Sequence, residues 1–177
     1  MHGVFMDILD VGVLLTGGPG VGKSEMALEL ICRGHRLIAD DAPQFHATAE
    51  GVEGRAPPVL QDFLEVGGLG VLNIRAMYGD AALCERKHLR LILHLEPLSQ
   101  ALRRQIDRLN GNMGSTDILG QAIDSMTLPV AAGRNLAVLA EAAVRNFLLI
   151  SDGYHAGTDL MQRQQQQMDG GPACDSS

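Results

Sequence analysis

The chain has 177 residues, of which 46% are hydrophobic and 3% aromatic, and this length and composition suit one domain with an aliphatic core. Its formal charge of −7 argues against a nucleic-acid partner, because phosphate binding needs clustered Lys and Arg. No apolar run approaches the ~20 residues that cross a bilayer, and the three cysteines are widely spaced, so we expect a cytoplasmic protein with no membrane partner.

The first part of the chain predicts two short strands and one helix. Strands are expected over 3–8 and 11–16, and the second is an apolar run of the kind found in buried sheets. Apolar residues at helical spacing predict a helix over 23–33, which Gly34 ends as a C-terminal cap. Three charged residues of this helix lie four apart and are expected to pair weakly with one another: Glu25, Glu29 and Arg33.

The middle of the chain predicts mainly β structure. Strands are expected over 36–40 and 88–95, with a hairpin over 43–58. A glycine-broken segment, FLEVGGLGVLNI, precedes the last of these strands. Residues 99–110 are expected as a solvated helix or loop, and GNMGST at 111–116 as a flexible connection.

The last third predicts one or two strands over 118–130 and an Ala/Leu-rich helix over 133–150. A short helix is expected over 157–168, followed by about eight disordered residues. Strands and helices in this order predict an α/β fold with a central β-sheet flanked by helices, and the glycine-rich motif Gly-x-x-x-x-Gly-Lys-Ser at 17–24 makes it a P-loop nucleotide-binding fold. We expect a catalytic domain over 1–158 and a C-terminal helix and tail over 159–177.

One glycine-rich motif carries the strongest chemical signal. The pattern Gly-x-x-x-x-Gly-Lys-Ser directly follows a predicted buried strand and opens a predicted helix, which is the setting of a phosphate-binding P-loop. Its backbone N–H groups can surround phosphate oxygens, and the helix N-terminus adds partial positive charge. Lys23 would reach the β- and γ-phosphates, and the Ser24 hydroxyl would bind Mg²⁺. The predicted nucleotide-binding residues are Gly17, Gly18, Pro19, Gly20, Val21, Gly22, Lys23 and Ser24.

Several carboxylates compete to bind the metal or act as the base. Asp40 and Asp41 end a predicted strand, at the sheet edge where the phosphates of a nucleotide would lie. Side chains alternate along a strand, so one of the two is expected to face the γ-phosphate and accept a proton from a hydroxyl. Glu65, in LEVGGLG, and Glu96, which closes LRLILHLE, are the alternatives for the metal.

Three separated segments of the chain resemble a known family. HGVFMDILDVGVLLTGGPGVGKSEMALELICRGHRLIADD, LEVGGLGVLNI and LPVAAGRNLAVLAEAAVRN are similar to the catalytic domain of HPr kinase/phosphorylase. That bacterial enzyme phosphorylates a serine of the phosphocarrier protein HPr and removes the phosphate by phosphorolysis. The resemblance runs from His2 to about Asn146. The family usually carries another domain ahead of this one, which we expect to be either truncated or naturally absent here.

The resemblance implies a role for several residues. His2 matches the active-site histidine, although a lone histidine is by itself more often a surface residue. Lys23 matches the P-loop lysine, and Asp40 matches the aspartate that takes the seryl proton and returns one in the reverse reaction. Arg108, in DRLNG, matches a catalytic arginine. Arg134 is the cation of PVAAGR, a segment associated with dephosphorylation.

The resemblance also implies cofactors and partners. Mg²⁺ would be bound by Ser24 and Glu65, ATP would be the phosphoryl donor, HPr the partner, and a homo-hexamer the assembly. One departure is Gly67, where the family has arginine in LEVRGLG, so catalysis is expected to be weaker. Two other functions stay open: a kinase for a small hydroxylated metabolite, with GNMGST as its lid, and a nucleotide-binding regulator without catalysis.

Overall fold

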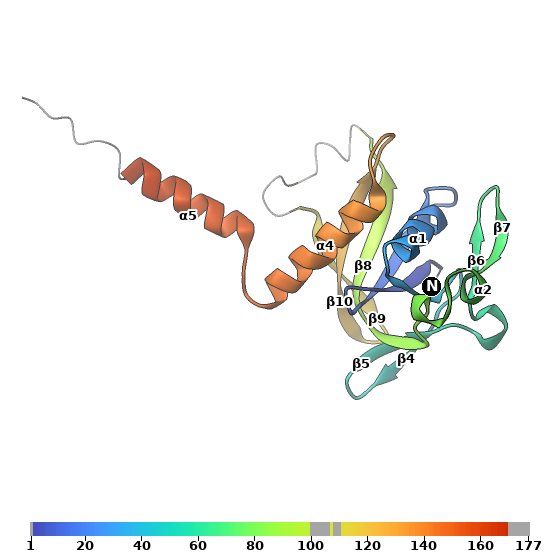
Figure 1. Ribbon diagram of the computed structural model, residues 1–177. Coiled ribbons are helices and arrows are strands. Elements are labelled where there is room, and N and C mark those ends of the chain that lie inside the picture. The colour runs from blue at the N-terminus through green and yellow to red at the C-terminus, as the bar shows by residue number, and fades with distance from the viewer. Residues whose placement is uncertain (1, 100–106, 108–110, 170–177) are drawn as a thin grey trace, which may run out of the picture.

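The structure is a computed structural model that describes residues 2–99, 107 and 111–169. It consists of a central mixed β-sheet with helices on one face and a separate two-stranded hairpin (Figure 1). In chain order the elements are β1 Val4–Ile8, β2 Val11–Gly17, α1 Lys23–Cys32, β3 Arg36–Ala39, β4 Gln44–Thr48, β5 Gly51–Arg55, β6 Phe63–Val66, β7 Gly70–Asn73, α2 Ile74–Tyr78, β8 Arg86–Pro97, β9 Met113–Ile118, β10 Gln121–Val130, α4 Leu136–Ser151 and α5 Ala156–Asp169, with short 3₁₀ turns at Pro58–Leu60 and Asp80–Ala82.

The order of strands in the sheet is β3-β1-β2-β8-β10-β9, with the β4–β5 hairpin attached to β8. Strands β2, β8 and β10 pair in parallel, whereas β1 is antiparallel to both β2 and β3. Strand β3 therefore runs in the same direction as β2, and the carboxyl ends of β3, β2, β8 and β10 lie at one edge. The start of β1, next to His2, lies at the same edge. This arrangement confirms the predicted α/β fold.

The predicted strands at 3–8, 11–16, 36–40 and 88–95 are confirmed, as are the 43–58 hairpin and the first helix. The helix expected over 133–150 begins at Leu136, because the side chain of Asn135 accepts a hydrogen bond from the Val138 N–H and caps it. The glycine-broken segment forms the β6–β7 hairpin, and the C-terminal helix is present as α5.

One predicted connection is wrong. Residues 113–116 of the GNMGST stretch belong to β9, which pairs with β10 in antiparallel register. Glycine and polar residues conceal this strand in the sequence, and only pairing with β10 stabilises it. The helix or loop expected over 99–110 falls, apart from Ser99 and Asp107, outside the described residues, and so does the disordered tail.

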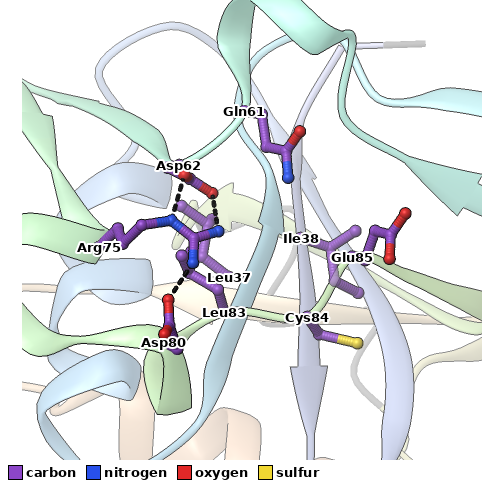
Figure 2. A pocket seen from close by; sticks show the side chains of 9 residues that line it. All are labelled: Leu37, Ile38, Gln61, Asp62, Arg75, Asp80, Leu83, Cys84 and Glu85. Atoms are coloured by element: carbon purple, nitrogen blue, oxygen red, sulfur yellow. Dashed lines mark hydrogen bonds and ion pairs between the residues drawn. The ribbon is translucent and has the colours of Figure 1, made fainter.

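The β6–β7 hairpin is tied to the domain at its base. Arg75 of α2 donates two hydrogen bonds to Asp62, at 2.6 and 3.1 Å, and a further bond to Asp80 (Figure 2). These residues line a cavity of about 240 Å³ beside β3, which also includes Leu37. Since β6 begins directly after Asp62, the Arg75 cluster helps to fix where β6 lies.

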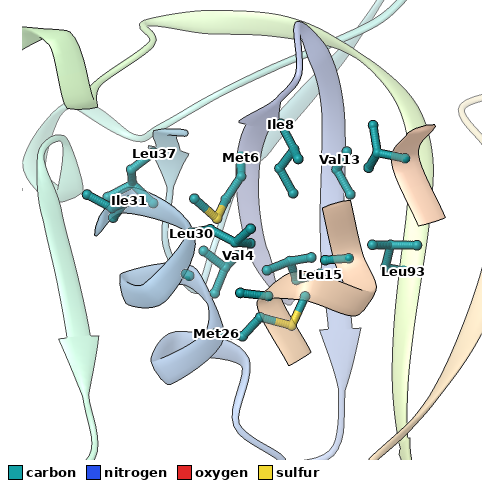
Figure 3. Close-up of a cluster of buried hydrophobic side chains, with 14 of the residues drawn as sticks. Val4, Met6, Ile8, Val13, Leu15, Met26, Leu30, Ile31, Leu37 and Leu93 are labelled. Atoms are coloured by element: carbon teal, nitrogen blue, oxygen red, sulfur yellow. The ribbon is translucent and has the colours of Figure 1, made fainter. Parts of the chain in front are cut away.

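The main core lies between the sheet and helices α1 and α4. Met26 and Leu30 of α1 face Val4 and Leu15 of the sheet (Figure 3), and all four side chains are buried. Burial of one such side chain contributes about 1.5–3 kcal/mol. Phe147 and four small or branched residues bury the corresponding face of α4: Ala137, Ala140, Ala143 and Val144.

Polar side chains join α1 and its C-terminal end to α4. Arg33 binds both carboxylate oxygens of Glu141, at 2.9 and 2.6 Å, and His35 lies 2.8 Å from the same carboxylate. Glu29 accepts a hydrogen bond from Asn135 at 2.5 Å. The hydrogen bonds of Arg33 and Glu29 therefore go to α4. The expected weak pairing of Glu29 with Arg33 remains as a Coulombic attraction: the pKa of Arg33 is raised by its hydrogen bond to Glu141 and, to a smaller extent, by the charge of Glu29.

Helix α5 projects away from the sheet (Figure 1) and leaves several apolar side chains exposed, among them Leu160 and Met161. No helix among the described residues has the length and apolar character needed to cross a membrane.

The pairing of Glu141 predicts a dependence of stability on pH. The hydrogen bonds from Arg33 lower the pKa of Glu141 from 4.5 to about 2. A carboxylate with a depressed pKa stabilises the fold above its unfolded-state pKa, and that stabilisation is lost as the pH falls from about 4.5 through about 2. We expect Glu141→Gln to lower the free energy of unfolding at neutral pH by about 1 kcal/mol.

Urea unfolding of both proteins across this pH range measures the effect. The difference in unfolding free energy between wild type and Glu141→Gln is expected to shrink as the pH falls below 4.5. A difference that stays constant with pH would contradict the assignment.

Candidate active site

The phosphate-binding loop connects the end of β2 to the start of α1, as the motif predicts. Gly17 allows no side chain, because a Cβ atom there would lie 2.5 Å from the carbonyl oxygen of Leu95 on β8. Gly22, the N-cap of α1, has a φ of 101°, which L-residues rarely adopt. The Lys23 ammonium donates to the carbonyl oxygens of Gly17 and Gly18, each at 3.0 Å. The lysine therefore lies over its own loop, at the place where phosphate oxygens would bind.

The loop opens into a cavity of about 580 Å³ at the carboxyl edge of the sheet. Residues from β1, the loop, α1, the end of β3 and the β6–β7 hairpin meet there. The cavity is lined by His2, Gly3, Val4, Gly17, Pro19, Gly20, Gly22, Lys23, Ser24, Glu25, Asp40, Asp41, Glu65 and Gly67. It thus brings together the predicted residues His2, Lys23, Ser24, Asp40 and Glu65. Of the remaining motif positions, Gly18 is exposed and Val21 packs against the core.

Asp40 is the most constrained carboxylate of the cavity. One of its oxygens accepts a hydrogen bond from the Asp41 N–H at 2.9 Å, and the other accepts from the Glu65 N–H at 2.8 Å. Burial is the largest influence on its pKa and raises it, and these two hydrogen bonds oppose the rise. A carboxylate held in one orientation, with a raised pKa, is suited to accept a proton from a hydroxyl group.

Asp41 also lines the cavity, which corrects the expectation that only one of the two aspartates faces it. Strand β3 ends at Ala39, and Asp41 has a left-handed φ of 62°, so the alternation of a strand no longer applies. The Asp41 carboxylate lies 3.5 Å from Nδ1 of His2, and both side chains are exposed. Next to His2, the Gly3 N–H donates to the carbonyl oxygen of Asp41 at 3.2 Å. Gly3 also permits the close approach of this segment to β2, because a Cβ atom there would lie 2.4 Å from the carbonyl oxygen of Leu15.

Glu65 reaches the cavity because β6 alternates. Leu64 and Val66 are buried in the core, and the side chain between them points the other way. Glu65 lines the same cavity as Ser24, whereas Glu96 at the end of β8 does not line it. The described residues contain no group of three or more His, Cys, Asp or Glu that could hold a metal ion by itself. A hydroxyl and a carboxylate fit Mg²⁺, which keeps several waters and binds through one or two protein oxygens plus phosphate oxygens.

One charged residue of the cavity carries no catalytic signal in the sequence. Glu25 follows the motif and looks like an ordinary helix residue, but it lines the cavity. Its Oε1 atom lies 3.4 Å from the position of a Cβ atom on Gly67. Together with Asp40, Asp41 and Glu65, it brings four carboxylates to a cavity in which Lys23 is the one Lys or Arg among the lining residues.

The two arginines predicted for the site are placed differently. Arg108 lies outside the described residues. Arg134 is exposed in the loop between β10 and α4, which leaves the same edge of the sheet as the phosphate-binding loop.

The parallel strands, the glycine-rich loop and the cavity at its mouth define a P-loop protein of the kinase fold class. Comparison with known families is consistent with this class: the HPr serine kinase C-terminal domain matches residues 1–164. The chain therefore belongs to the HPr serine kinase C-terminal domain family.

Related proteins agree with this family. The chain is 48% identical over 92% of its length to the HPr kinase/phosphorylase of Chromobacterium violaceum, and 50% identical over 94% to that of Neisseria meningitidis. It covers 52% of each, and so spans about half the length of these relatives. The solved HPr(Ser) kinase/phosphatase of Coxiella burnetii superposes with a TM-score of 0.78 at 32% identity, over 87% of this chain and 93% of that one.

Asp40 is expected to be required for transfer and not for nucleotide binding. Asp40→Asn should reduce turnover by about 10²–10⁴-fold and leave the affinity for nucleotide nearly unchanged, because the loop supplies the affinity. Since burial raises the pKa of Asp40 above 3.8, the acid limb of the wild-type pH–rate profile should lie above that value. Glu96→Gln is the matched control and should retain turnover. Equal losses in the two variants would remove Asp40 from the chemistry.

Proposed function

We propose that the chain is the catalytic domain of an HPr kinase/phosphorylase, which transfers the γ-phosphoryl group of ATP to a serine of HPr and also removes it. The observation that carries the proposal is Asp40, held by two N–H groups in the same cavity as the phosphate-binding loop. The family match and the names of the relatives support it.

In the forward direction the seryl oxygen attacks the γ-phosphorus, its proton passes to Asp40, and the bond from phosphorus to ADP breaks. In the reverse direction an oxygen of inorganic phosphate attacks the phosphorus of phosphoserine, the bond from phosphorus to the serine oxygen breaks, pyrophosphate forms, and Asp40 returns a proton to that serine oxygen. Lys23 balances charge on the transferring group. Ser24 and Glu65 would hold Mg²⁺, which when bound supplies further positive charge to the phosphates.

The two other functions receive less support. A metabolite kinase needs a lid, and most of its candidate, GNMGST, lies in strand β9 of the sheet. A regulator without catalysis is suggested by Gly67, but Asp40 and Lys23 both line the cavity.

We further propose that the domain works as a homo-oligomer, a hexamer by family resemblance, in the cytoplasm. Exposed apolar residues of α5, such as Leu160 and Met161, support contact with another chain. Cys32 and Cys84 are free thiols, which fits a reducing compartment.

The function is tested by incubating the chain with HPr, Mg²⁺ and ATP labelled in the γ-phosphate. We expect label on a serine of HPr, and release of labelled pyrophosphate when the product is given inorganic phosphate. Transfer to small hydroxylated metabolites alone would favour the metabolite kinase. Nucleotide binding without transfer to any acceptor would favour the regulator.

Restoring a cation at position 67 is expected to raise activity. Gly67 has no left-handed φ, and the nearest atom to a Cβ there is the Glu25 carboxylate, so Gly67→Arg can be accommodated. The guanidinium would lie in a cavity with four carboxylates and should raise kcat/KM by about tenfold, because it adds positive charge where the phosphates react. Gly67→Gln is the uncharged control. If both variants show the same kcat/KM, charge at this position does not limit transfer.

A further inference from the structure

The side-chain amide of Asn135 makes two hydrogen bonds, one as an acceptor and one as a donor. Its oxygen accepts from the Val138 N–H at 2.8 Å and caps α4, and its nitrogen donates to Glu29 of α1 at 2.5 Å. The orientation of the amide is determined by its partners, since a backbone N–H needs an acceptor and a carboxylate needs a donor. Asn135 therefore joins the first turn of α4 to the helix that begins with the phosphate-binding lysine.

Leu136, which follows Asn135, lies against the phosphate-binding loop, and the residues before Asn135 come from the same edge of the sheet. Leu136 is 3.7 Å from the position of a Cβ atom on Gly22, so the start of α4 packs against the loop. On the other side, residues 131–134 follow β10, whose carboxyl end shares the sheet edge of β2. In the sheet, β10 and β3 lie on opposite sides of β2. Residues 131–134 therefore leave the same edge of the sheet as the phosphate-binding loop, on the side of β2 opposite β3.

This segment carries a cation that no described residue neutralises. Arg134 is exposed, and its side chain forms no hydrogen bond or ion pair with another described residue. The cavity itself contains four carboxylates and one lysine among its lining residues. A bound pyrophosphate or nucleoside triphosphate therefore needs more positive charge than the cavity lining supplies.

We propose that Asn135 is a positioning residue: by tying α4 to Glu29 of α1, it holds Arg134 beside the phosphate-binding loop as a countercharge for the bound polyphosphate. The effect is local, because Arg33 and His35 bind Glu141 and join the same two helices independently. Loss of the Asn135 bond frees the loop without separating α1 from α4. The inference rests on the proposed function for its role in phosphoryl transfer, but its test requires only polyphosphate binding.

The test measures the affinity of the whole chain for magnesium pyrophosphate by calorimetry, with thermal unfolding as a check on folding. Asn135→Asp keeps a good N-cap but replaces the donor with a carboxylate that faces Glu29. Adding Glu29→Gln to this variant reverses the direction of the hydrogen bond, since the glutamine amide can donate to the aspartate carboxylate. We expect Asn135→Asp to weaken binding by about tenfold, the double variant to recover most of the loss, and Glu29→Gln alone to bind like wild type.

Variants of Arg134 separate positioning from a direct charge effect. If Asn135 acts through Arg134, adding Asn135→Asp to Arg134→Ala causes no further loss of affinity. Losses that multiply in the combined variant would overturn the proposal, because the new carboxylate would then act on the phosphates directly. Asn135→Ser keeps a capping oxygen without adding charge and should weaken binding in the same direction.

Two further outcomes are decisive. Wild-type affinity in both Asn135→Asp and Asn135→Ser would overturn the inference, as would a wild-type chain that binds no pyrophosphate. If the chain binds pyrophosphate with the expected pattern but does not phosphorylate HPr, the proposed function fails and the role of Asn135 stands.

Discussion

The parallel pairing of β2 with β8, and of β8 with β10, is the constraint on which the site depends. It brings the carboxyl ends of these strands to one edge, where β3 also ends and β1 begins. At Gly17 the two backbones are so close that a side chain cannot be accommodated, and the chain leaves the sheet into the phosphate-binding loop. Residues from four separate segments meet at this edge because of the order of the strands and the packing of the β6–β7 hairpin, and not because they are near one another in the chain.

The cavity combines requirements that oppose one another. Burial of Asp40 raises its pKa and makes its carboxylate a stronger proton acceptor, but it also disfavours the charged form that must accept the proton. The N–H groups of Asp41 and Glu65 counter this by stabilising the anion in one orientation. The surrounding carboxylates would repel a polyphosphate, and the residues that line the cavity do not offset that repulsion by themselves. A divalent cation and additional basic side chains therefore suit this site.

Helix α1 links the loop to the rest of the domain through two kinds of contact. Its apolar face, with Met26 and Leu30, packs on the sheet, and its charged residues bind side chains of α4. The contact through Glu141 is partly shielded from water and the contact through Asn135 is exposed, so the first contributes more to stability. The second lies next to the phosphate-binding loop, where a small displacement affects ligand binding more than folding.

Local patterns in the sequence were sufficient to predict α1, the β1–β2 hairpin and the phosphate-binding loop. The spacing of apolar residues and the backbone freedom of glycine act over a few neighbouring positions. The same reasoning missed β9, whose stability comes from pairing with β10, and it did not predict the hydrogen-bond partners of Glu29 and Arg33, which lie on α4. It also missed Glu25, since nothing near Glu25 in the chain indicates that the β6–β7 hairpin will lie opposite this residue. The sequence by itself determined the phosphate-binding loop and the residue types available to it. The tertiary structure decided which carboxylates face that loop, because the strand order brings the end of β3 to the same edge and core packing places β6 beside α1.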